Sequence, residues 1–199
     1  SCKSGRIEDL TEDGKILIRN ASCGYLGMGF SVAVIISFMA PLVMQIIATP
    51  AYFKGHMVTG ILCLFFVLDG YLGISQLGLL KNKKIYLLTI FAVVSVFVSF
   101  IAIYLLIPVV GVLGAAIGML IGMILRNVLS QIISETYFQV NFMNRVVFLQ
   151  FILALVTILN HLTYGSNIYS FLLSLLSVGL ICVQTYQSSA VFRHILMRE

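Results

Sequence analysis

Long apolar stretches separated by short polar segments are the main pattern of the chain. An α-helix rises 1.5 Å per residue, so about 20 apolar residues cross the ~30 Å hydrocarbon layer of a bilayer. Two uncharged stretches, 85–125 and 146–192, are about twice that length, and each contains a break, at Pro108–Gly114 and Tyr164–Asn167. Proline cannot continue a helix, and glycine favours turns. The pattern therefore predicts six spans, at 25–48, 57–79, 85–107, 113–137, 146–163 and 168–190.

The predicted fold class is all-α, a polytopic transmembrane helix bundle, because the stretches lack the alternation of membrane β-strands. The composition agrees. Of 199 residues, 60% are apolar and 10% are charged, against roughly 45–50% and 25% in soluble domains. A soluble domain needs more charge on its surface, and a disordered chain needs lower hydrophobicity. Both classes are excluded.

The basic residues predict the orientation of the spans. Ten of the twelve Lys and Arg residues fall in one set of alternate loops, Lys54 stands alone in the other set, and Arg126 lies within a span. Cytoplasmic loops are the ones enriched in Lys and Arg. We therefore expect a cytoplasmic loop at 1–24, a cytoplasmic tail at 191–199, and outer connections at 49–56, 108–112 and 164–167.

No pattern typical of an enzyme or a cofactor site is present in the sequence. It contains no G-x-S-x-G, no H-E-x-x-H and no C-x-x-C among its four cysteines. The net charge of +5 comes from scattered basic residues, whereas a nucleic-acid groove needs clustered ones. We expect no enzymatic activity, no cofactor, no metal and no nucleic-acid partner.

Ionisable residues inside the predicted spans are the strongest functional indication. Asp69 lies at the middle of the second span and Arg126 at the middle of the fourth, and a charge there normally faces protein or water. Polar residues follow Arg126 in two neighbouring columns, down to Ser134 and Glu135. Two interpretations stay open: a structural ion pair with polar contacts between helices, or a water-filled cavity. The candidate cavity-lining or substrate-binding residues are Asp69, Gln76, Arg126, Asn127, Ser130 and Gln131.

Small residues and one proline indicate special helix contacts. Gly114, Gly118 and Gly122 form a ladder that predicts close packing against another helix, with a mobile gate as the alternative. Gly24-x-x-Gly27-x-Gly29 predicts helix packing rather than a phosphate loop. Pro41 is expected to kink the first span, either for structural reasons or at the border of a substrate path. His161, near the end of the fifth span, is expected to lie in the membrane interface.

The order of several short motifs resembles a known family. The sequence passes from R-N-A-S-x-G-Y (19–25) through A-P-L (40–42), A-Y-F-K-G (51–55) and K-N-K-K (81–84) to I-Y-L-L-I-P-V-V-G-V-L-G-A-A-I (103–117). The last string resembles the L-L-I-P..G..G-A-A pattern of bacterial polysaccharide flippases in the multidrug/oligosaccharidyl-lipid/polysaccharide exporter superfamily.

The resemblance implies a transporter of two helical lobes that moves undecaprenyl-diphosphate-linked oligosaccharides across the cytoplasmic membrane. Residues 25–137 would form a four-helix region of the C-terminal lobe, and 138–190 an additional helix pair. The chain starts with Ser and a polar segment, so we expect it to be the C-terminal portion of a longer protein, with the N-terminal lobe as partner. The resemblance assigns no site residue, and Asp69 departs from the mostly apolar pattern expected there.

Other classes remain as alternatives. A multidrug-type exporter of the same fold, or an exporter of another lipid, would share these features. A membrane-embedded glycan polymerase or acyltransferase should have a sizeable extramembrane loop bearing Arg, His or Asp, whereas the longest outer connection predicted here is 49–56. A purely structural membrane subunit would not need ionisable groups at mid-bilayer.

The charge bias makes the topology testable. A cysteine introduced at Lys54 or Asn167 should react with an impermeant thiol reagent in intact cells, because both positions are predicted to face outward. A cysteine at Asn82 should react only after lysis. Labelling of position 82 in intact cells would show that the orientation is the reverse of the predicted one.

Overall fold

A computed structural model describes residues 12–47, 55–137, 145–164, 169, 172–183 and 185 of the protein. All regular structure in these residues is helical, as predicted. The helices are α1 (Glu12–Ile47), α2 (His56–Ser75), α3 (Leu77–Lys81), α4 (Ile85–Val110), α5 (Val112–Tyr137) and α6 (Arg145–Tyr164), and an apolar helical segment follows at Leu172–Val183.

Four helices are long and apolar enough to cross a membrane. They are Ile18–Ile47 within α1, His56–Ser75, Ile85–Val110, and Val112–Thr136 within α5. These helices correspond to the first four predicted spans. The remaining apolar helices, Val147–His161 and Leu172–Val183, are shorter. Helix length and composition therefore make the chain a multi-pass membrane protein, and the fifth and sixth spans stay predictions.

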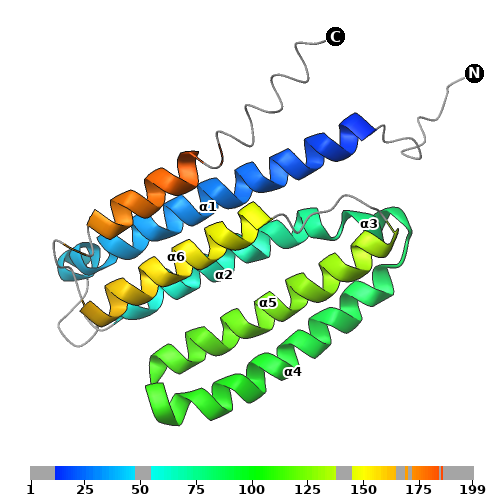
Figure 1. Ribbon diagram of the computed structural model, residues 1–199. Coiled ribbons are helices and arrows are strands. Elements are labelled where there is room, and N and C mark those ends of the chain that lie inside the picture. The colour runs from blue at the N-terminus through cyan, green and yellow to red at the C-terminus, as the bar shows by residue number, and fades with distance from the viewer. Residues whose placement is uncertain are drawn as a thin grey trace, which may run out of the picture.

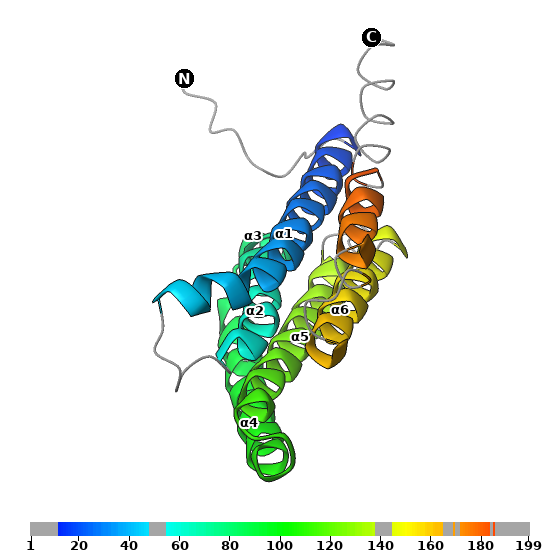
Figure 2. The same cartoon turned by 90° about the vertical axis from the view of Figure 1, so that its left-hand side faces the viewer.

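The long helices lie side by side along a common direction (Figure 1). α4 and α5 form an antiparallel hairpin, α2 packs between α5 and α1, and α6 lies mainly against α1. The Leu172–Val183 segment also runs beside α1, as both Figure 1 and Figure 2 show. There the hydroxyl of Ser31 lies 3.9 Å from the sulfur of Cys182.

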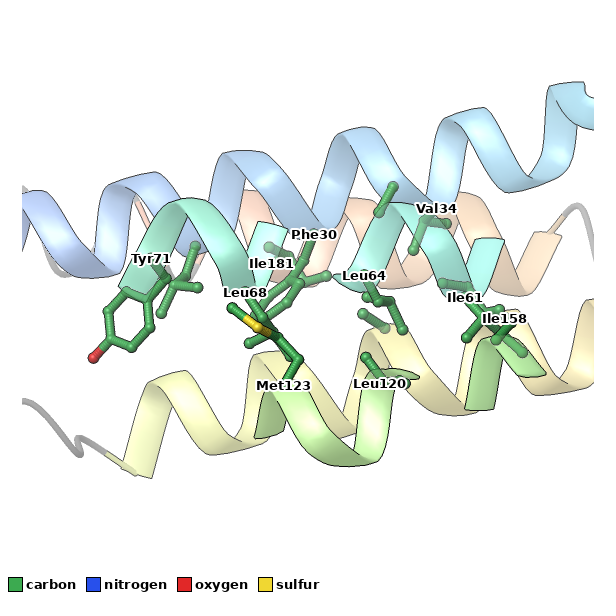
Figure 3. Packing of buried hydrophobic residues seen from close by; sticks show 14 of the residues in the cluster. Phe30, Val34, Ile61, Leu64, Leu68, Tyr71, Leu120, Met123, Ile158 and Ile181 are labelled. Carbon is green, nitrogen blue, oxygen red and sulfur yellow. The ribbon is translucent and has the colours of Figure 1, made fainter. Parts of the chain in front are cut away.

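One cluster of buried apolar side chains holds this arrangement together (Figure 3). It joins α1, α2, α5, α6 and the last segment, and the ring centroids of Phe30 in α1 and Phe151 in α6 lie 5.8 Å apart. Within α4 the buried residues are Phe91 and Ser95, so most of its apolar surface is available to lipid. The cluster includes Leu26, Phe30, Val34, Ile61, Leu64, Leu68, Leu120, Met123, Ile158 and Ile181.

α1 and α2 differ from the predicted spans at their ends. α1 begins at Glu12, inside the segment predicted to be a loop. A helix satisfies its own backbone hydrogen bonds in water as well as in hydrocarbon. The helix can therefore extend beyond the membrane, from the predicted span back to Glu12. α2 ends at Ser75 rather than at Leu79, because its 20 residues already cover about 30 Å. The chain then turns through α3 and through Lys83, whose φ is 56°.

The α4–α5 turn is much tighter than predicted. Pro108 lies inside α4, which ends at Val110, and α5 begins at Val112. The expected connection 108–112 is therefore reduced to Gly111, whose φ of 66° favours glycine. The N–H of Gly111 donates to the carbonyl of Ile107 over 2.8 Å. Pro108 removes only one helical hydrogen bond, which spanning helices tolerate.

The glycine ladder of α5 packs directly against the backbone of α4. A methyl group added at Gly114 would lie 2.6 Å from the carbonyl carbon of Leu106, and one at Gly118 would lie 2.9 Å from the nitrogen of Ile103. One at Gly122 would lie 2.7 Å from the carbonyl oxygen of Ser95. The predicted close packing is confirmed.

The small residues of α1 and its proline also behave largely as expected. Gly27 faces Thr185, and a methyl group on Gly29 would lie 2.7 Å from Val67 of α2, whereas Gly24 has open space around it. Pro41 lies inside α1. Figure 2 shows the C-terminal, light-blue turns of α1 bending away from the rest of the helix. The expected kink is therefore present.

The α4–α5 contact can be tested by adding one methyl group. Gly118→Ala should destabilise the protein by about 1–3 kcal/mol, because the backbone of Ile103 cannot move aside cheaply. Gly73→Ala is the matched control, since Gly73 lies in α2 with nothing within 4 Å of the added carbon. Unfolding in detergent micelles measures both changes. Equal stability of the two variants would contradict the packing described here.

Candidate functional site

Asn127 is the polar link between α2 and α5. Its side-chain nitrogen donates two hydrogen bonds of 3.1 Å, to the carbonyl oxygens of Leu68 in α2 and Met123 in α5. Its side-chain oxygen is buried and has no hydrogen-bond partner. The bond to Leu68 fixes which turn of α2 lies beside which turn of α5, and it leaves one strong acceptor available.

A cavity of about 160 Å³ lies next to this link, with walls from α1, α2, α5 and α6. α6 packs mainly on α1 rather than on α5, so the cavity occupies the space between α5 and α6. Most of the wall is apolar, and three lining residues are polar: Tyr71, Asn127 and Gln131. An enclosed apolar cavity of about this volume binds molecules such as benzene in other proteins, whereas this one is partly open at the surface.

Several buried polar atoms near the α2–α5 contact lack hydrogen-bond partners. The Tyr71 hydroxyl and the Asn127 oxygen belong to residues that line the cavity, while Gln76 Nε2, Arg126 Nε and Ser130 Oγ lie elsewhere. Leaving such an atom unpaired costs about 1–3 kcal/mol. Groups of this kind are therefore the places where water or a ligand gains most by binding.

The structure divides the polar stripe of α5 into two sides. Asn127 and Gln131 line the cavity. Arg126 and Ser130 continue the four-residue steps of the glycine ladder, one and two turns beyond Gly122. They therefore lie toward the α4 side of α5. Of the six candidate residues, the cavity brings together two.

Asp69 and Arg126 lie at one level but are not brought together. Asn127, which follows Arg126, donates a hydrogen bond to the carbonyl of Leu68, which precedes Asp69. The Asp69 side chain is nevertheless exposed on the outside of α2, whereas Arg126 Nε is buried. No ion pair joins these two described residues, so the sequence-based interpretation as a structural pair is not what this structure contains.

The depth of Asp69 also needs a correction. Because α2 ends at Ser75, Asp69 lies six residues, or about 9 Å, from that end rather than at the centre of the span. Gln76 lies in the turn after α2, so a seven-residue helical spacing does not place it on the face of Asp69.

Two buried polar residues were missed or placed differently by the sequence. Tyr71 is 4% exposed. The only sequence signal for its burial is its position two residues after Asp69, which places it on the opposite face of α2. His161 was expected in the interface. It is buried, with its ring centroid 5.5 Å from that of Phe38 in an edge-on contact.

Comparison with known protein families, curated proteins and solved structures found no match to this chain. The fold and the site therefore define a class of protein. It is an all-helical, multi-pass membrane protein with a mostly apolar cavity between four helices, and an ionisable side chain, Asp69, is exposed on the outside of α2.

The separation of Asp69 and Arg126 can be tested by a double-mutant cycle. Asp69→Asn and Arg126→Gln should have effects on the free energy of unfolding that add within about 0.5 kcal/mol, as expected for groups without direct contact. Unfolding in micelles of both single variants and the double variant gives the coupling. A coupling above about 1 kcal/mol would restore the ion-pair interpretation.

Proposed function

We propose that this chain is part of a membrane transporter that flips lipid-linked oligosaccharide or polysaccharide precursors across the cytoplasmic membrane by alternating access. In this proposal the six apolar helices form most of the C-terminal lobe of a two-lobe exporter. The substrate path lies between this lobe and an N-terminal one. The partners are the bilayer, the lipid-linked substrate and that second lobe, and no cofactor is needed.

The observation that supports this proposal best is the exposed position of Asp69. A carboxylate at the centre of the bilayer costs about 2.5–3.5 kcal/mol or more, and one within a span normally faces water or protein. Asp69 lies within a helix apolar enough to span the membrane, yet on the face of α2 that no other described helix covers. Phe66 and Gly73 share this exposed face, whereas Gly70 lies against Tyr25 of α1. A transport path alongside α2 would supply the water that the carboxylate needs.

Arg126 supports a phosphorylated substrate. A guanidinium group binds a diphosphate through two parallel hydrogen bonds, which a lysine cannot reproduce. The Nε of Arg126 is buried and has no hydrogen-bond partner, so this donor is not committed to another side chain. The 160 Å³ cavity adds a mostly apolar space on the neighbouring side of α5. This combination suits a ligand that has both hydrocarbon and polar groups.

Substitution in the complete gene product tests the proposal. In a bacterial strain without its own oligosaccharide-lipid flippase, Asp69→Asn and Arg126→Lys should each lower export of lipid-linked sugar at least about tenfold. Loss of a charge-assisted hydrogen bond of about 1.5–3 kcal/mol has that effect. The abundance of both variants in the membrane should not change.

Two further variants make the result interpretable. Asp69→Glu should retain transport, and Phe97→Leu, on the exposed side of α4, serves as the control for expression. Full export by both Asp69→Asn and Arg126→Lys would contradict the proposal. Export of drugs, with no effect on lipid-linked sugar, would instead identify a multidrug-type exporter.

A further inference from the structure

A second, much smaller cavity lies where α6 ends and α2 begins. It offers about 10 Å³ of room and is bounded by α1, α6 and the last helical segment. Four of its lining residues are polar, and each is at least nine-tenths buried. They are Ser37 of α1, Thr157 and His161 of α6, and Ser174. This cavity shares no lining residue with the 160 Å³ cavity.

His161 brings an unsatisfied polar atom to this cavity. The residue is 8% exposed, and its Nε2 is buried without a hydrogen-bond partner. Its ring is held edge-on against Phe38. Nε2 therefore requires a partner that can either donate or accept, depending on which tautomer the ring adopts.

Pro41 affects a second polar group, which belongs to a residue that lines this cavity. In a helix the N–H of residue 41 would donate to the carbonyl of Ser37, but proline has no N–H. The Ser37 carbonyl is therefore deprived of its helical hydrogen bond in a residue that lines the cavity. On the opposite side Gly60 of α2 packs closely against Ser37 and Ile158, which leaves no room for a side chain from α2.

The size and chemistry of the cavity select its occupant. About 10 Å³ is the room that one water molecule requires, and a buried water typically has two to four polar partners. A bare cation fits less well, because none of the described lining residues carries a carboxylate. His56, in the first turn of α2, carries no negative charge either. The hydroxyl of Thr157 already donates to the carbonyl of Leu153 over 2.7 Å, so its oxygen is left as an acceptor.

We propose that this cavity binds one water molecule, which joins His161 Nε2 to the Ser37 carbonyl that Pro41 leaves without its helical bond. The water donates one hydrogen bond to the carbonyl and forms a second hydrogen bond with Nε2 of the imidazole. It thereby ties the bent end of α1 to the end of α6, and the bend at Pro41 and the buried histidine form one unit. This inference does not rest on the proposed transport function.

A double-mutant cycle between Pro41 and His161 tests the proposal on the complete protein in detergent micelles. His161→Phe should lower the ratio of folded to unfolded protein by about fivefold to a hundredfold, the effect of leaving a buried polar group unpaired. Pro41→Ala restores the N–H that bonds to the Ser37 carbonyl. In the Pro41→Ala background, His161→Phe should therefore lower the ratio at least about threefold less.

Control variants separate this effect from a general loss of packing. Val156→Phe, on the exposed side of α6, should have the same effect in both backgrounds. His161→Gln keeps a polar group and should lose less stability than His161→Phe. If His161→Phe fails to accumulate, the proposal requires that Pro41→Ala restore its accumulation.

Two outcomes would overturn the proposal. The first is additivity of Pro41→Ala and His161→Phe, or failure of His161→Phe to accumulate in both backgrounds. The second comes from unfolding at one ionic strength in sodium, lithium, potassium and N-methylglucamine chlorides. A bound water predicts equal stability in all four salts, whereas stabilisation by one cation that Ser37→Ala abolishes would assign the cavity to that cation.

Discussion

Hydrocarbon offers no hydrogen-bond partners, so every backbone N–H and C=O group in a membrane must be satisfied within the protein. This constraint explains the helical structure of the described residues. It also explains why Ser22, Ser31, Thr157 and Thr185 donate their hydroxyls to carbonyls one turn earlier in their own helices. The few irregular positions stand out against this background. An unsatisfied polar atom lies at each of two of them: Gln76 Nε2 in the turn after α2, and His161 Nε2 in the cavity that Ser37 lines one turn before Pro41.

α5 organises the bundle because its sides carry different residue types. Its glycines let the backbone of α4 approach closely, and the association gains van der Waals contact where lipid provides no hydrophobic drive. Asn127 and Gln131 face a cavity on another side, and Asn127 bonds across to α2. Close packing on one side and open polar groups on another thus come from a single helix. A rigid α4–α5 hairpin can then support a site whose opposite wall, α6, has few contacts with α5.

The sequence predicts the long helices well because hydropathy and length report directly what crossing a bilayer requires. It fails at helix ends such as Glu12 and Ser75, because hydropathy marks which residues can lie in hydrocarbon and not where a helix begins or ends. For the candidate site, helical rise placed Asp69 and Arg126 at one level, and the Asn127–Leu68 bond agrees. The rotation of each helix about its axis depends on its packing partners, which periodicity does not give. For this reason the sequence revealed neither the outward position of Asp69 nor the burial of Tyr71 and His161.

The rotation of α2 also bears on function. A buried ion pair can exist for structural reasons alone, because each charge compensates the other and no water is needed. Asp69 and Arg126 lie at one level on different sides of the α2–α5 contact and do not form such a pair. Each charge therefore needs its own water, counter-charge or ligand in the membrane. Two separate requirements of this kind are expensive in a bundle that only has to be stable. In the function proposed above, a phosphorylated lipid that passes alongside α2 and α5 would meet both requirements.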